Sequence, residues 1–333
     1  MGDLVPSPAP SEPVVTFATV ERNIAKVDGL VVPLSRKEKR RGGFELYYPS
    51  QNEFNNDGMN FTFRVFQQFG AWDESVLLVV LKVMGQRGKI LCPEPEGPNA
   101  CAIRLGLDAG GAALAAATLI VDNTSYAELL RHMGLDTQGR PRSMLREALK
   151  RLTATTLWVR HRDGSEGSMN LLTTRISPDG HLHVSIHYLL ARAFLGDSRW
   201  ARIDLEERWA LSGDIARILH RWLSAWLDEG EERQARLSTL ERHVWGNSST
   251  GSDRARRFQD LRAALAEIAA LDTGWTVLAA EKRGDAAYTI RRPDRPAGGR
   301  VQAVVAVAAP GARPRIGSAA QRMASTDAMS PAP

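Results

Sequence analysis

A short stretch centred on residue 259 combines side chains that read DNA bases with side chains that neutralise phosphates. Arg256, Gln259 and Ala263 fall on one side of a helix-period pattern, opposite the apolar Phe258 and Leu261. In the major groove, Arg pairs with guanine and Gln with adenine, and a small Ala lets the helix approach the bases. Arginines in the first turn oppose the helix dipole unless an anion such as a phosphate is near. The candidate DNA-binding residues of this stretch are Arg254, Arg256, Arg257, Gln259, Arg262 and Ala263.

A second basic row lies earlier in the chain and suits phosphates better than bases. Arg142, Arg146 and Lys150 recur every four residues, and Arg140 precedes them. Such a row is expected to follow a DNA backbone, and the same face would serve equally well in a homodimer contact through this part of the chain. Two polar turns between strand-like runs add further basic candidates: Lys282 and Arg283 in the later turn, and Arg160 and Arg162 in the earlier one.

The elements that must position these residues follow an order that occurs twice. Each copy has an apolar helix, a short helix that opens near a Ser and closes at a Gly, a longer helix and then two β-rich runs around a turn. Ser125 and Ser238 are the expected caps. This is the order of a winged helix-turn-helix, in which the third helix enters the major groove and the hairpin is the wing. The expected ranges are 76–84, 125–134, 141–152 and 157–176 in the first copy, and 215–227, 238–246, 252–271 and 275–291 in the second.

The whole chain is therefore predicted to be an α+β protein with two tandem winged-helix domains. The first should span residues 44–204, with strand-like runs at 44–48 and 60–67, an insertion at 88–124 and a further strand at 181–187. The second should span residues 205–293. Segments rich in Pro, Ser, Ala and Gly flank both, so we expect disordered tails at residues 1–43, which end in a basic run, and 294–333.

Composition limits the class of protein. The 333 residues are 43% hydrophobic and 24% charged, with a formal net charge of +5, which indicates a folded chain with a mild preference for anionic partners. Two cysteines, Cys92 and Cys101, cannot form a disulfide framework. There is no apolar segment of the length that crosses a bilayer and no signal-peptide pattern, so we expect a cytoplasmic protein with no membrane partner.

The signals for an enzyme are poor. The chain has neither the glycine-rich phosphate loop of nucleotide hydrolases nor the dinucleotide-binding fingerprint of dehydrogenases. His181, His183 and His187 alternate along a predicted strand and invite a zinc interpretation, yet no carboxylate or cysteine cluster completes a ligand set. We expect no catalytic residues, no cofactor and no bound metal.

The ordered motifs of the second copy resemble a known family. The run from Ile215 to Leu223, the pairs Val244-Trp245 and Arg256-Arg257, and the segments 274–277 and 288–293 are similar to replication protein C of IncQ-type plasmids, an iteron-binding initiator. The resemblance extends more weakly upstream, through Ser125-Tyr126 and 149–152 to the basic run at 36–41, and covers roughly residues 35–293.

This resemblance implies a protein that binds directly repeated duplex sites at a plasmid origin, opens adjacent AT-rich DNA and lets a plasmid-encoded helicase and primase load. It places base reading on the helix with Arg256, Arg257, Gln259 and Arg262, and phosphate contacts on the helix with Arg142, Arg146 and Lys150. Phe258 and Asp260 depart from the basic character expected there. Two other functions fit the same residues: a winged-helix repressor on a palindromic operator, and an adaptor that binds a helicase but no DNA.

Overall fold

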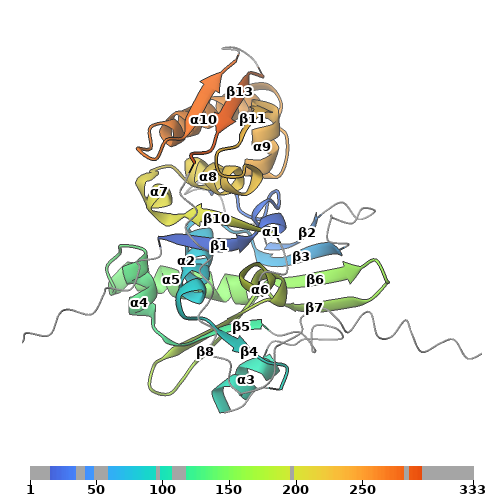
Figure 1. Cartoon of the computed structure of the whole chain (residues 1–333), viewed down its shortest axis with the longest axis vertical. Coiled ribbons are helices and arrows are strands. Elements are labelled where there is room, and N and C mark those ends of the chain that lie inside the picture. Colours follow the sequence, from blue (N-terminus) through green and yellow to red (C-terminus); the bar gives the residue numbers. More distant parts are fainter. Residues whose placement is uncertain are drawn as a thin grey trace, which may run out of the picture.

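The computed structural model describes residues 16–34, 42–48, 59–94, 98–106, 118–195, 199–280 and 285–294. The molecule is elongated, with the later elements at one end and two larger sheets at the other (Figure 1). In the described ranges the chain is mixed α and β, as the sequence predicts. No helix in these ranges has the length and apolar character needed to cross a bilayer.

A two-stranded ribbon lies in the middle of the molecule and corrects one expectation about the N-terminus. Strand β1 (Phe17–Glu21) pairs antiparallel along its whole length with β10 (Trp200–Asp204), and every residue of β1 is buried. Helix α1 (Arg22–Ala25) follows at once, and the Glu21 carboxylate accepts a hydrogen bond from the backbone N–H of Ile24 at 2.7 Å. The prediction of a disordered tail over 1–43 is therefore wrong for these residues, because a distant strand supplies their hydrogen-bond partners. The expected tail at 294–333 lies outside the described residues beyond position 294.

Two four-stranded antiparallel sheets form the larger end. The first has the order β2-β3-β6-β7 and the second β4-β5-β9-β8. The later of the two β-rich runs expected within 157–176 is divided at Leu171, so that β7 pairs with β6 in one sheet and β8 with β9 in the other. The strands of the two sheets are β2 (Gly42–Tyr48), β3 (Met59–Gln67), β4 (Lys89–Leu91), β5 (Thr118–Thr124), β6 (Thr156–His161), β7 (Glu166–Asn170), β8 (Leu172–Ile176) and β9 (Leu182–Ile186).

Helices pack against and beside these sheets. The central one, α2 (Ala71–Arg87), is buried on almost all sides, because Val and Leu residues fill most of its surface and even Asp73 and Glu74 are covered. Helix α4 (Tyr126–His132) begins as predicted, with the Ser125 hydroxyl accepting from the backbone N–H of Glu128 at 3.1 Å. The other helices of this end are α3 (Pro98–Gly106), α5 (Gly139–Thr153) and α6 (Tyr188–Leu195).

The other end contains the second predicted set of helices and its hairpin in the predicted order, with an additional strand, β11, that the sequence pattern does not indicate. After α7 (Leu205–Ala210) come α8 (Asp214–Trp226), β11 (Glu232–Arg236), α9 (Leu237–Trp245), α10 (Gly251–Ala269), β12 (Thr276–Ala279) and β13 (Ala287–Arg291). Strand β13 lies between β11 and β12 in a three-stranded antiparallel sheet. Gly246 ends α9 with a φ of 73°, a left-handed conformation that glycine adopts without steric cost.

The cap expected at Ser238 has a different form. The N-cap of α9 is Arg236, two residues before Ser238, and the backbone N–H and hydroxyl of Ser238 both donate to the Asp285 carboxylate at 2.8 Å. Asp285 precedes β13, so a carboxylate from the hairpin segment satisfies the helix N-terminus, where a negative charge is favourable. The contact ties α9 to the strand that follows the turn.

The two ends share one continuous apolar core around α8. The predicted stripe of α8 is buried from Ile218 to Leu223, and this helix packs against α10 on one side and against α1 and α2 on the other. A buried ionic cluster lies at the same junction: the Arg208 guanidinium is 2.6 Å from the Glu74 carboxylate, and Arg221 contacts the other oxygen of Glu74. Glu207 and His220 form a second buried pair at 2.7 Å. The contacts of Glu74 with Arg208 and Arg221, together with apolar packing, therefore join the two predicted domains, whereas Glu207 and His220 both belong to the second.

Candidate nucleic-acid interface

Helix α10 presents the predicted face to solvent. Phe258, Leu261, Leu265 and Ile268 are buried toward α8 and α9, because they recur at helical spacing. Arg256, Gln259 and Ala263 lie on the opposite side and are exposed. The Arg256 side chain is 72% exposed, and its nearest ionic neighbour is the equally exposed Asp253 carboxylate at 3.6 Å. This face is free to approach another molecule.

Arg257 has a different position from the rest of the predicted set. Its guanidinium lies 3.3 Å from the buried Glu241 carboxylate, donates to the Asn247 side-chain oxygen at 2.8 Å and stacks over the Trp245 ring. Its side chain is 19% exposed. These contacts hold the loop between α9 and α10, so Arg257 positions α10 rather than extending from it.

The remaining predicted residues of this end differ in accessibility. Arg254 lies over the Phe258 ring at 4.9 Å and is 3.9 Å from Asp285, with 44% of its side chain exposed. Arg262 is half-buried. Lys282 and Arg283 fall in the turn between β12 and β13, outside the described residues.

Helix α5 carries the second basic row on its exposed side. Arg140, Arg142, Arg146 and Lys150 are all exposed, whereas Leu145, Leu149 and Leu152 of the same helix are buried. Arg142 stacks over the Tyr126 ring at 5.6 Å, and Lys150 forms an ion pair with Glu147 at 2.8 Å. Arg151, one residue further, points inward and pairs with the buried Asp73 carboxylate at 2.6 Å. The exposed row is therefore distinct from the structural arginine beside it.

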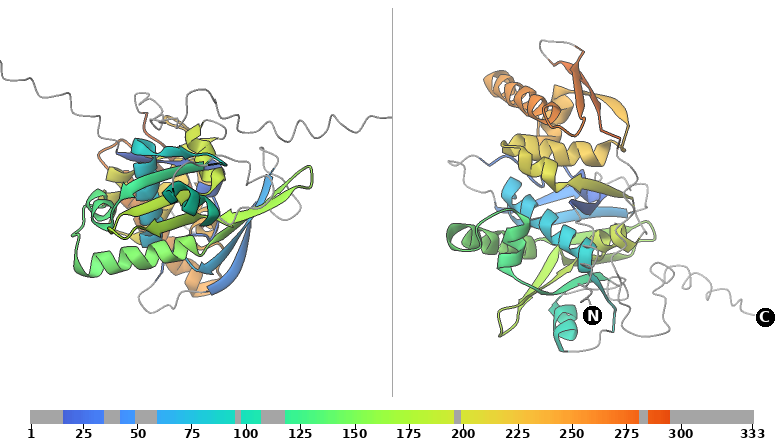
Figure 2. Two further views of the ribbon diagram at one scale, coloured as in Figure 1. Left: turned by 90° about the horizontal axis from the view of Figure 1, so that it is seen from below. Right: turned by 60° about the vertical axis from the view of Figure 1, so that its left-hand side comes forward.

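The two basic helices lie toward the same side of the molecule. In Figure 1 and in the right-hand view of Figure 2, the ribbons of α10 at one end and of α5 at the other both lie to the left. Arg160 and Arg162, near the tip of the β6–β7 hairpin, are also exposed. The hairpin projects away from the body of the molecule (Figure 2).

The three histidines of the 181–187 run do not share an accessible face. His183 and His187 are 5% and 0% exposed, whereas the side chain of His181 is 43% exposed. Within the ranges that the structure describes, no group of three or more His, Cys, Asp or Glu side chains is arranged to hold a metal ion. Alternate residues of an exposed strand would share a solvent-facing side, but all five residues of β9, Leu182–Ile186, are buried. The histidines therefore present no common surface to a metal ion.

His187 gives a pH-dependent prediction. Burial lowers its pKa to about 3, and its Nδ1 accepts a hydrogen bond from the backbone N–H of Leu189 at 3.1 Å. An unfolded chain has a histidine pKa of about 6.5, so between these values the unfolded state binds more protons. The free energy of unfolding should therefore fall as pH falls below about 6.5, by up to about 1.4 kcal/mol per pH unit. His187→Asn keeps an acceptor without titrating, and urea unfolding between pH 7 and pH 5 should show a flatter slope; an unchanged slope would contradict this.

A known family matches the chain over a range that includes all of the described residues. The family model described as Replication protein C (RepC) matches residues 15–294 of the chain. No curated protein matches it in sequence. Two crystal structures of domains 2 and 3 of RctB match this chain, each with a TM-score of 0.45 and 12% sequence identity. The first match covers 83% of this chain and 99% of the RctB chain, and the second covers 82% of this chain and 96% of the RctB chain.

Proposed function

The chain belongs to the replication protein C family, and from that premise we propose that it initiates plasmid replication by binding directly repeated duplex sites at an origin. One observation carries the proposal: Arg256, Gln259 and Ala263 are exposed together on one side of α10. An arginine, an amide and a small side chain on one helical face are the groups that read guanine, adenine and thymine in the major groove.

The element order around α10 supports a winged-helix interpretation. Helices α8, α9 and α10 precede a hairpin of β12 and β13, and β11 completes the sheet. In a winged helix the third helix lies in the major groove and the hairpin contacts the adjacent backbone. On this interpretation α10 reads bases, while Lys282 and Arg283 of the hairpin turn contact phosphates.

The first predicted domain would anchor the backbone. Its α5 exposes the cationic row Arg140, Arg142, Arg146 and Lys150 and contains no Asn or Gln to accompany them, a composition that suits phosphates better than bases. Two DNA-binding helices on one side of an elongated molecule would fix its direction on each repeat. Binding to tandem repeats would then mark and open the neighbouring AT-rich DNA and admit a plasmid-encoded helicase and primase, with no catalytic step by this chain.

The experiment that tests this proposal is a selection from random duplexes near physiological salt, followed by titration of selected and scrambled sites. We expect a tandemly repeated, asymmetric motif bound about 10³- to 10⁷-fold more tightly than scrambled DNA. A palindromic motif would instead indicate a two-fold repressor. Failure to enrich any motif, together with helicase binding that salt does not weaken, would indicate an adaptor.

If α10 reads bases and α5 contacts phosphates, variants of α5 should weaken binding to all duplexes alike. Arg142→Ala and Arg146→Ala should each weaken binding to selected and scrambled duplexes by similar factors, since phosphates are common to both. The slope of log affinity against log salt should fall by about 0.9 for each phosphate that the variant no longer neutralises. A salt series on both duplexes checks this. Weaker binding of the selected duplex alone would assign base reading to α5.

A further inference from the structure

One face of the sheet β2-β3-β6-β7 is turned away from the core and carries aromatic rings. Leu157 and Val159 of β6 point into the core, so Trp158 between them points outward. Trp158 is 41% exposed and Tyr47 of β2 is 46% exposed. Phe66, at the end of β3, is 60% exposed. Three large aromatic side chains left exposed on one face of a sheet point to a binding role.

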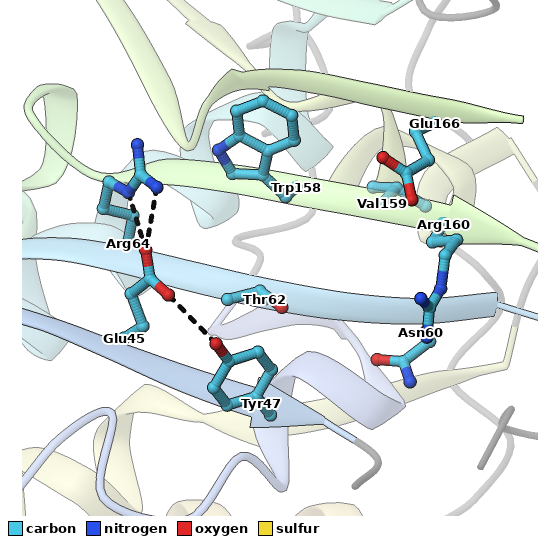
Figure 3. Close-up of a pocket in the computed structure, with 9 residues that line it drawn as sticks. All are labelled: Glu45, Tyr47, Asn60, Thr62, Arg64, Trp158, Val159, Arg160 and Glu166. Carbon is cyan, nitrogen blue, oxygen red and sulfur yellow. Dashed lines mark hydrogen bonds and ion pairs between the residues drawn. The ribbon is translucent and has the colours of Figure 1, made fainter. Parts of the chain in front are cut away.

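The strand register fixes how the rings are spaced. Thr62 pairs with Tyr47 on one side and with Trp158 on the other, so the two rings stand two strands apart, about 10 Å. Figure 3 looks onto this face and shows both rings roughly flat on the sheet, with the small Thr62 side chain between them. A trough with a volume of about 390 Å³ lies over these residues.

Hydrogen bonds hold the trough in place before any ligand arrives. The Glu45 carboxylate accepts from Arg64 Nε at 2.9 Å through one oxygen and from the Tyr47 hydroxyl at 3.0 Å through the other (Figure 3). The Arg64 guanidinium lies 5.8 Å from the centre of the Trp158 ring. Rings that are already oriented lose less conformational entropy when a planar ligand stacks on them.

The charge of the trough selects which part of a nucleic acid would enter it. Two arginines and two glutamates line it, and Arg160 lies opposite Glu166 in the strand register, as Arg64 lies opposite Glu45. The lining therefore has no formal net charge and attracts phosphates weakly. Its rings and the Thr62 hydroxyl suit base faces and base edges. In a duplex the base faces are covered by their neighbours, so only unpaired bases could stack here.

We propose that this face is a stacking platform for single-stranded DNA, with Trp158 and Tyr47 each supporting one unpaired base. The inference rests on the proposed function, because an origin opened beside the repeats would supply the unpaired strand. It adds a second DNA site to the chain, separate from α10 and built on the first predicted domain. The polar floor and balanced charges distinguish this face from the continuous apolar surface that a stable contact between two copies would bury.

The test measures binding of a labelled oligothymidine of about 16 nucleotides to the full chain, in parallel with an abasic oligonucleotide of the same length. Loss of one stacking ring in Trp158→Ala should weaken oligothymidine binding about 5- to 150-fold, whereas Trp158→Phe should retain most of it. Ile176→Ala, which removes an exposed apolar side chain from β8 in the other large sheet, is the matched control and should change nothing. The abasic strand should bind weakly to every variant.

The outcomes separate this platform from the proposed duplex function. If Trp158→Ala no longer binds oligothymidine but binds selected duplexes as tightly as the wild type, both the stacking platform and the proposed duplex function are supported. If the chain shows no duplex specificity yet needs Trp158 for oligothymidine, the platform holds and the proposed function fails. Equal binding of the abasic strand, or no effect of Trp158→Ala, would overturn the platform. Loss of self-association in Trp158→Ala with unchanged oligothymidine binding would also overturn it and assign the face to a second copy.

Discussion

Arg208→Ala is expected to lower the free energy of unfolding by about 3–5 kcal/mol, the typical cost of breaking a buried ion pair by removing one partner. Arg208 is fully buried, pairs with Glu74 at 2.6 Å and donates to the carbonyl oxygens of Ala71 and Arg217. Its removal leaves a buried carboxylate with Arg221 as its remaining ionic partner, and leaves two carbonyls without this donor. Urea unfolding followed by circular dichroism measures the change.

The exposed pair of Lys150 and Glu147 provides the matched control for this prediction. Its atoms are as close, at 2.8 Å, but both side chains are more than half exposed. Lys150→Ala should therefore change stability by less than about 1 kcal/mol. If Arg208→Ala cost no more than Lys150→Ala, the buried cluster would not hold the junction between α2, α7 and α8 together.

Arg256→Ala combined with Gln259→Ala is expected to reduce affinity for the selected duplex by about 2–6 kcal/mol. Each side chain that reads a base through two hydrogen bonds contributes about 1–3 kcal/mol of discrimination, and losses at separate base pairs add roughly. Binding of scrambled DNA should fall much less, because only one cation is removed. Competition titrations with both duplexes measure the difference.

The fold of this double variant should be intact, since both side chains are exposed. Substitutions at such positions usually change stability by less than about 0.5 kcal/mol. Unfolding curves that match the wild type would therefore assign the loss to the interface. Equal losses on selected and scrambled duplexes would contradict base reading by α10.

Local periodicity is enough to predict helices such as α8 and α10 and their faces, although it does not indicate α1, α3, α6 or α7. The apolar stripe of α8 and the exposed side of α10 follow from residues three and four apart, which any helix brings together. The Ser125 cap and the glycine that ends α9 are also signals contained within a few residues. The exposed side of α10, and with it the candidate interface, could therefore be predicted from the sequence.

Long-range pairing explains what the sequence pattern misses. Residues 17–21 are rich in β-forming side chains, but nothing local indicates that β10 is their partner. The spacing of Arg257 places it among the base-reading residues, whereas Glu241 of another helix determines its position. The aromatic face of the first sheet could have been found from Trp158, since an aromatic residue between Leu157 and Val159 in a strand must face away from the core. The same alternation also fits the hairpin of a winged helix, so it does not by itself indicate a binding face.

The most direct test of base reading by α10 is the duplex selection repeated with Arg256→Ala beside the wild type. The proposed function predicts that both proteins enrich the same repeat, but that the variant loses preference at one position, a guanine in the wild-type motif. All other positions should keep their preferences. Identical motifs at every position would contradict the central claim, because Arg256 would then contact no base.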